Sequence, residues 1–229
     1  MESYRGDRAI AVQNSFLRRV YTWMALGLGI TAVISLFVSA SPALEQIFIG
    51  NQVLFFLLII AELGMVVGLS AGINRISAST ATIMFFIYSA LNGLTFSFIF
   101  LVYTAASIAS TFFITAGTFA AMSIYGYTTK RDLTAWRSFL FMGLIGVIIA
   151  AVVNIFLHSM MIYWIVTFAG VIVFVGLTAY DTQKIKEMAY QGFGNEQMEQ
   201  KAGVIGALRL YLDFINLFLL LLRLFGQRR

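Results

Sequence analysis

Seven long apolar stretches follow one another along this chain, and they decide what it can fold into. Each is close to the ~20 residues that a helix needs to cross the hydrocarbon core of a membrane. Of the whole sequence 60% is hydrophobic and only 11% is charged, where soluble domains carry about a quarter charged residues. We therefore predict an all-α polytopic membrane protein, a single membrane domain over residues 1–229, with a polar segment at 1–19 and a bundle at 20–225. The seven predicted spans are residues 20–38, 53–69, 81–102, 108–124, 139–157, 162–179 and 210–225.

The basic residues predict the orientation, because Lys and Arg near span ends stay in the cytoplasm. The loops at residues 39–52, 103–107 and 158–161 contain no Lys or Arg, whereas the alternate connections do. This places the N-terminus in the cytoplasm, and the short loops suit a bacterial plasma (inner) membrane. The net charge of +5 is then topogenic, and no nucleic-acid partner is expected. The basic residues on the cytoplasmic side are Arg5, Arg8, Arg18, Arg19, Arg75, Lys130, Arg131, Arg137, Lys184, Lys186 and Lys201.

The C-terminal end departs from this pattern. Seven crossings put it outside, yet Arg223, Arg228 and Arg229 lie there. The 13 residues between Arg209 and Arg223 make only about 20 Å of helix. We therefore expect the last helix to be a short central span or a re-entrant segment, and residues 182–201 to be the longest polar connection.

Three acidic residues are predicted at membrane depth, where a charge is costly and normally faces protein or water. Asp181 lies three residues before Lys184, and Asp213 lies four residues after Arg209. If these bases mark the cytoplasmic interface, both aspartates sit about one helical turn inside it. The third acid, Glu62, is expected to line the same pathway or to pair with Arg75 or Asn92.

Two carboxylates at one depth in a low dielectric do not both ionise easily, so the pair is predicted to share a proton and act as a pH sensor. The ionised pair also offers oxygen ligands suited to Ca²⁺, with carbonyls and water completing the shell. The structural alternatives are an i, i+4 ion pair of Asp213 with Arg209, and a cap or interfacial role for Asp181 beside Lys184.

Four stretches carry a family resemblance that extends over essentially the whole chain. GLTAYDTQKI at residues 176–185 and ALRLYLDFINLFLLLLRLFG at residues 207–226 resemble the two most characteristic segments of the Bax inhibitor-1 (transmembrane BAX inhibitor motif) family. YGYTTKRDL at residues 125–133 and FMGLIG at residues 141–146 resemble its bacterial members.

This resemblance implies a bundle whose seventh helix is central and wrapped by the six others. It also implies a leak of cations, chiefly Ca²⁺, gated by pH through two aspartates that correspond to Asp181 and Asp213. The family's arginine latch for the first aspartate is transferred to Arg75. Arg209 departs from the family pattern, and its charge would shift the pH range of Asp213.

Other functions were weighed against the leak. An intramembrane aspartyl protease is a less favoured alternative, because it needs Gly-x-Gly-Asp before its second aspartate, and Leu210-Tyr211-Leu212-Asp213 stands here. We expect no enzyme. The aromatic and Met residues are ordinary lipid-facing and packing residues, to which we assign no cofactor. An interaction protein is the main alternative, with residues 1–14 engaging a membrane-anchored protease in quality control or stress survival. The glycines at 64, 68 and 72 form a small-xxx-small stripe, which predicts close approach to a neighbouring helix.

Overall fold

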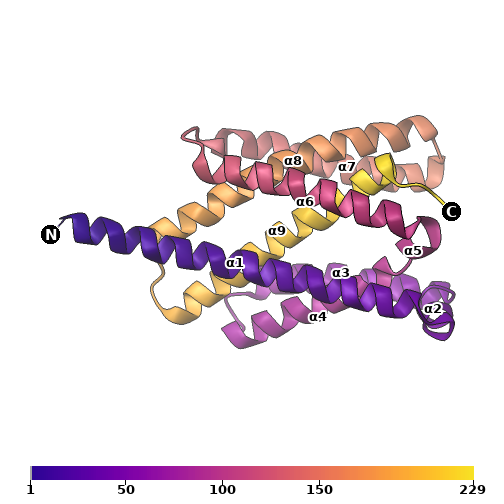
Figure 1. Cartoon of the computed structure of the whole chain (residues 1–229), viewed down its shortest axis with the longest axis horizontal. Coiled ribbons are helices and arrows are strands. Elements are labelled where there is room, and N and C mark those ends of the chain that lie inside the picture. The colour runs from indigo at the N-terminus through magenta and orange to yellow at the C-terminus, as the bar shows by residue number, and fades with distance from the viewer. Residues whose placement is uncertain (1) are drawn as a thin grey trace. The chain divides into compact units, whose positions relative to one another are not determined.

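A computed structural model describes the main chain of residues 2–229 and the side chains of residues 14–229. Long helices make up nearly all of it (Figure 1). Within the described residues, seven helices are long and apolar enough to cross a membrane, which confirms the predicted all-α protein with seven candidate spans. The elements are α1 (Glu2–Ser39), α2 (Pro42–Phe48), α3 (Gln52–Gly72), α4 (Ala78–Phe96), α5 (Ile99–Val102), α6 (Ala105–Thr128), the 3₁₀ helix η1 (Leu133–Trp136), α7 (Arg137–Leu157), α8 (Met160–Gln191) and α9 (Glu196–Phe225).

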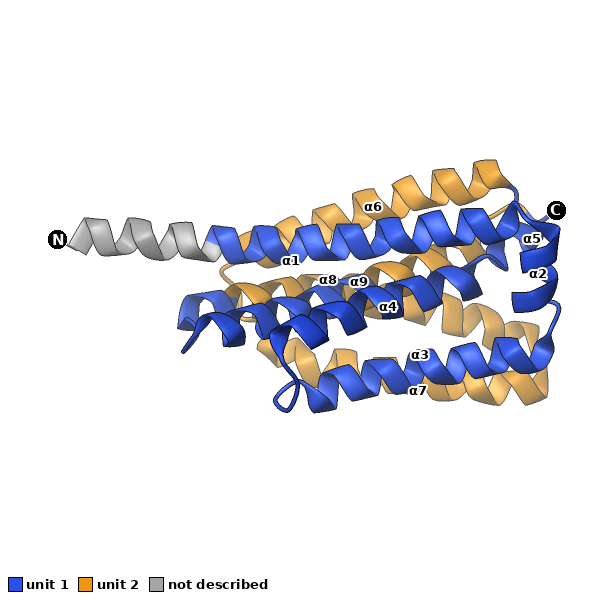
Figure 2. Cartoon of the chain, turned by 90° about the horizontal axis from the view of Figure 1, so that it is seen from below, with its two compact units in different colours: residues 1–104, 187–211, 228–229 blue, residues 105–186, 212–227 orange. Residues whose placement is uncertain are grey.

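The chain divides into two compact units (Figure 2). Unit 1 comprises residues 1–104, 187–211 and 228–229, and unit 2 comprises residues 105–186 and 212–227. Helices α8 and α9 each run without a break from one unit into the other. The single membrane domain stays a prediction.

Glycines set the close packing of α1 on α4 in unit 1. A Cβ on Gly27 would lie 2.8 Å from ring and hydroxyl atoms of Phe85 and Ser89, and one on Gly93 would lie 2.7 Å from Cβ of Ile34. The stripe at Gly64, Gly68 and Gly72 behaves differently, since a Cβ there would meet nothing within 4 Å. The prediction that this stripe lets α3 approach a neighbour is therefore wrong within this chain.

Unit 2 is built around α8, which packs on α7 and on the second half of α9. Phe174 of α8 forms a buried cluster with Leu217, Leu220 and Leu221 of α9. A Cβ on Gly176 would lie 2.5 Å from Cδ2 of Leu140 on α7, so the two helices are in close contact at this glycine. This packing fixes α8 along the stretch that leads to Asp181.

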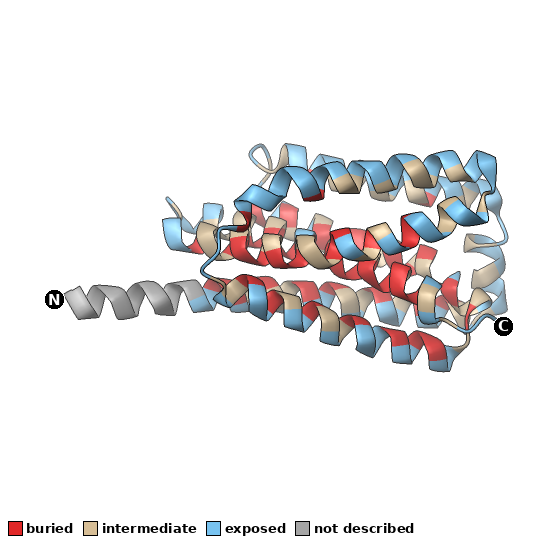
Figure 3. Cartoon of the chain, turned by 90° about the horizontal axis from the view of Figure 1, so that it is seen from above, coloured by how far each residue is buried: buried red, intermediate tan, exposed pale blue. Residues whose placement is uncertain are grey.

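Helix α9 is the most enclosed of the seven candidate spans. In its most apolar window 72% of the residues are buried, against 39% or less in the other six (Figure 3). It begins beside α1, where Arg19 pairs with Glu199 at 3.3 Å. Beyond the end of α9, the Arg229 amide donates to the Val102 carbonyl oxygen of the same unit at 3.0 Å.

Two expectations about this part of the chain are wrong. The polar residues 182–201 are not a connection, because α8 continues to Gln191 and α9 starts at Glu196. The re-entrant alternative for the last helix also fails, because its 30 residues form one continuous helix of about 45 Å. The apolar pattern alone had missed the polar first half of that helix.

Candidate ion- and proton-binding site

Asp181 lies on α8 close to the connection between α6 and α7. Its side chain is half-buried. The next residue, Thr182, donates from its hydroxyl to Ser123 Oγ of α6 at 3.4 Å. The α8 helix continues for ten residues beyond Asp181 to Gln191, so the alternative that Asp181 caps a helix is wrong.

Gln183 anchors this stretch of α8 to the connection between α6 and α7. Its side chain is 7% exposed. Its Oε1 accepts the Leu133 amide at 2.8 Å, and its Nε2 donates to the Arg131 carbonyl oxygen at 2.9 Å. Both main-chain groups at this connection are thereby satisfied, and the connection is held at the level of Asp181.

The lysines after Asp181 lie over aromatic rings. Lys186 Nζ donates to the Tyr127 carbonyl oxygen at 2.7 Å and lies 4.7 Å from the centre of the Tyr127 ring. Lys184 Nζ lies 5.8 Å from the Tyr180 ring. Such amphipathic rings and bases are typical of a membrane interface, which supports the predicted depth of Asp181 just inside it.

Asp213 lies on α9 and is only 4% exposed. The neighbouring Phe214 packs its ring against the rings of Phe112 and Phe119 on α6, with both centroid distances 5.5 Å. Burial in such surroundings penalises an ionised carboxyl unless other groups compensate its charge. The role of Asp213 in binding a proton or a cation stays a prediction.

Helix α6 relates the levels of the two aspartates within unit 2. Phe119 contacts the residue after Asp213, and Ser123 contacts the residue after Asp181. Phe119 and Ser123 are four residues apart on one helix, which is about one turn, or 6 Å. The structure therefore brings Asp181 and Asp213 into one unit, at levels about one turn apart along α6.

The other predicted site residues lie in unit 1. Arg209 is on α9 and exposed. Arg75 is exposed in the turn after α3, where its amide donates to the Gly72 carbonyl oxygen at 2.8 Å. Glu62 on α3 accepts a hydrogen bond from the Thr95 hydroxyl at 2.8 Å. Its hydrogen-bond partner is thus one turn of α4 beyond the expected Asn92, and the latch role of Arg75 stays a prediction.

Sequence reasoning missed the polar side chains that position Asp181. Ser123, Thr182 and Gln183 carry no charge, so a search for ionisable groups passes over them. The sequence feature that could have identified them is an amide or hydroxyl side chain within an otherwise apolar helix, because such a group, when buried, needs a hydrogen-bond partner.

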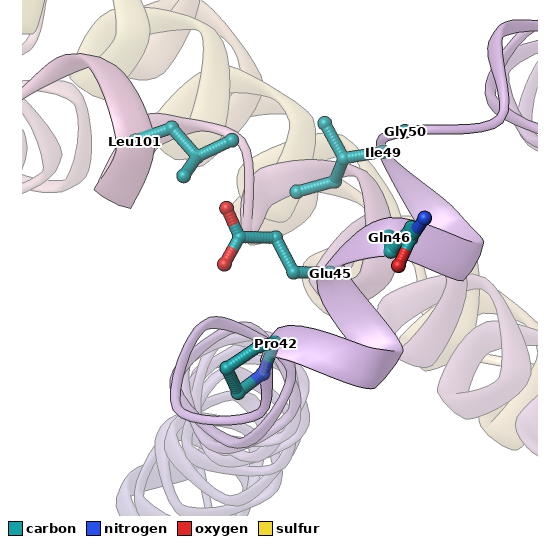
Figure 4. Close-up of a pocket in the computed structure, with 6 residues that line it drawn as sticks. All are labelled: Pro42, Glu45, Gln46, Ile49, Gly50 and Leu101. Atoms are coloured by element: carbon teal, nitrogen blue, oxygen red, sulfur yellow. The ribbon is translucent and has the colours of Figure 1, made fainter.

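Two further features bear on ion binding. Among the residues that the structure describes, no three His, Cys, Asp or Glu side chains converge as a metal site, so a cation at the aspartates would need main-chain, hydroxyl or water oxygens as well. A hollow in unit 1, lined by Pro42, Glu45, Gln46, Ile49, Gly50 and Leu101, contains a single carboxylate (Figure 4). None of the residues that line it is a predicted site residue.

The segment predicted to engage a membrane-anchored protease, residues 1–14, lies outside the residues whose side chains are described, apart from Asn14. Its role stays a prediction. So do the positions assigned to Arg5 and Arg8.

Comparison with known proteins gives matches over nearly the full length. Residues 13–229 match the family model described as "Inhibitor of apoptosis-promoting Bax1". The chain is 54% identical over 217 residues to "Inner membrane protein YbhL" of Escherichia coli strain K12, covering 94% of this chain and 93% of that protein. It is 46% identical over 220 residues to an uncharacterized protein of Borreliella burgdorferi, covering 96% and 95%. It is 38% identical over 217 residues to an uncharacterized membrane protein of Streptococcus pyogenes serotype M6, covering 93% of each.

Proposed function

The chain belongs to the Bax inhibitor-1 family, and from that premise we propose that it is a pH-sensitive leak for cations, chiefly Ca²⁺, in the bacterial inner membrane. Asp181 and Asp213 are its proton sensor and its cation ligands. The observation that carries the proposal is the placement of both aspartates on neighbouring levels of one unit, one half-buried and one buried. The inner-membrane location is supported by the printed name of the Escherichia coli relative.

The pair works through charge. With one proton between them, the two carboxyl groups carry a single negative charge, and a carboxyl to carboxylate hydrogen bond favours the closed arrangement of α8 and α9. When both ionise, like charges repel in a low dielectric and the helices separate. Such an element with two arrangements converts a local protonation into a change of conductance.

The cation is the cargo of this pathway. The ionised carboxylates offer the hard oxygen ligands that Ca²⁺ prefers, and two carboxylates alone leave most of its 6 to 8 positions to other oxygens. Binding that incomplete is weak, which suits an ion that must leave as easily as it enters.

The test is Ca²⁺ flux into proteoliposomes that contain an indicator dye, measured from mildly acidic to mildly alkaline pH. We expect Asp181→Asn, Asp213→Asn and the double variant each to abolish the pH dependence. Because the proton belongs to the pair, the double variant should add little to either single one.

The matched control is Asp132→Asn, which removes an acid from unit 2 outside the candidate spans and should leave the pH profile intact. Unchanged, pH-dependent flux in the double variant would remove the aspartates from the mechanism. Absence of flux in the wild-type protein at every pH would reject the leak itself.

A further inference from the structure

Unit 1 has a carboxyl group of its own in the middle of a candidate span. Glu62 lies ten residues after Gln52 and ten before Gly72, so about 15 Å of helix extends on either side. Its side chain is half-buried, and Leu58 one turn earlier on α3 is buried. An acid at this depth is costly when ionised and is normally held by protein groups.

The partner of Glu62 is a hydroxyl that can serve either protonation state. Thr95 Oγ1 lies 2.8 Å from Glu62 Oε1 and 3.1 Å from the main-chain oxygen of Asn92. A hydroxyl has one proton to donate and lone pairs that accept. When Glu62 is ionised, Thr95 donates to it. When Glu62 is protonated, the carboxyl donates to Thr95, and Thr95 donates to Asn92. Both states keep their hydrogen bonds without a movement of α3 or α4.

Polar side chains extend from this pair towards α9. The Asn92 amide donates to the Tyr88 carbonyl oxygen at 3.0 Å. The rings of Tyr88 and Tyr211 meet edge to face at 5.7 Å, and the Tyr211 hydroxyl lies 2.7 Å from Thr31 Oγ1. The charge of Glu62 interacts electrostatically with both phenols. The residues around Glu62 are thus in contact with α9 at Tyr211.

The charged residues in the segments before and after α3 lie far from Glu62 along the axis of this helix. Helix α2 carries Glu45 and precedes the start of α3, about 15 Å of helix away. Arg75 follows Glu62 by 13 residues, about 20 Å of helix, and is exposed. Among the described residues of unit 1, the titratable groups that interact with Glu62 are Tyr88 from α4 and Tyr211 from α9. The hydroxyl of Thr95 and the phenols of Tyr88 and Tyr211 are uncharged, so they do not neutralise an ionised Glu62. The Glu62 carboxylate can therefore bind a hydrogen ion.

We propose that Glu62 and Thr95 form a reversible proton-binding site inside unit 1, made of residues other than the two aspartates of unit 2. The ligand is a hydrogen ion that reaches the carboxyl from the aqueous phase and returns to it. The site goes beyond the proposed leak, since it would bind protons whether or not the protein conducts Ca²⁺.

The test is infrared difference spectroscopy of the reconstituted full-length protein during acidification, which detects the carbonyl stretch of a newly protonated carboxyl. The background is Asp181→Asn with Asp213→Asn, so that neither aspartate contributes. We expect the band in this background, its loss on adding Glu62→Gln, and its retention on adding Glu45→Gln as the matched control. A band unaffected by Glu62→Gln would overturn the proposal.

Thr95 gives a second, independent test that keeps the carboxyl in place. Thr95→Val has the same shape without the hydroxyl and should move the midpoint of the band to higher pH, because the ionised form loses its donor. Thr95→Ser restores a hydroxyl and should restore the midpoint. Equal midpoints in the Val and Ser variants would contradict the role of Thr95, and this result stands even if Glu62→Gln does not fold.

Discussion

Gly126→Ala tests whether the contact of α6 with α8 is what positions the Asp181 stretch. A Cβ on Gly126 would meet the main chain of Ala179, with its carbonyl carbon and Cα at 2.9 Å and its oxygen closer still. These are backbone atoms of α8, so they cannot rotate out of the way as a side chain would. The helices must therefore move apart by roughly an ångström to restore ordinary contact.

The expected magnitude follows from two opposing effects. Overpacking costs about 1–3 kcal/mol, and a contact with main chain belongs in the upper part of that range. Replacing Gly by Ala in a helix returns up to about 1 kcal/mol. The matched control on the same helix is Gly117→Ala, where a Cβ would meet nothing within 4 Å and only the helical gain remains. The free energies of unfolding of the two variants should then differ by about 2–3 kcal/mol.

The measurement is unfolding of the detergent-solubilised protein, followed by circular dichroism, together with the pH profile of Ca²⁺ flux. Separation of the helices would also break the Thr182 to Ser123 hydrogen bond, which is already 3.4 Å long, next to Asp181. We therefore expect a displaced pH profile in Gly126→Ala and an unchanged one in Gly117→Ala. Equal stability of the two variants would refute the reasoning, because the main-chain contact would then exert no strain.

Three smaller predictions follow from the hydrogen bonds. Gln183→Leu removes the hydrogen-bond partner of the Leu133 amide and of the Arg131 carbonyl oxygen in the connection between α6 and α7. It should lower the free energy of unfolding by about 2–4 kcal/mol. Tyr211→Phe loses a buried hydroxyl contact and should lower it by about 1 kcal/mol, while Tyr125→Phe at an exposed position should be neutral; both are read by the same unfolding assay. Asp132 accepts hydrogen bonds from the side-chain hydroxyl and the main-chain amide of Thr134, and these hold the pKa of Asp132 below its usual range. The stabilisation by this cap is therefore complete above the ordinary pKa and is lost as the pH falls through the lowered one, so an acid transition in Trp136 fluorescence, with the other tryptophans replaced, should vanish in Asp132→Ala.

The sequence predicted the seven candidate spans because a span depends on the transfer of apolar groups from water to hydrocarbon, and the composition of each segment determines that transfer. The glycines show where this stops. Gly64, Gly68 and Gly72 have the spacing of a packing stripe but face open space, while Gly126, which has Met122 and Lys130 at that spacing, lies against the main chain of α8. Which face of a helix packs against another helix depends on the sequence of both helices, so it cannot be predicted from one segment alone.

The same reasoning explains why the last helix was predicted to be too short. An apolar window begins at Leu210, because Arg209 and the polar residues before it lower the hydropathy of α9. Those residues need not face lipid: Glu199 pairs with Arg19 of α1, and Gly203 lies against Trp23. The last two residues of the chain are held within unit 1, since the Arg229 amide donates to the Val102 carbonyl oxygen and the main chain of Arg228 pairs with that of Tyr103. Main-chain pairing thus fixes the basic C-terminus beside α5 in unit 1, away from Arg19. The positive-inside pattern of the arginines alone would have placed it at the same end as Arg19.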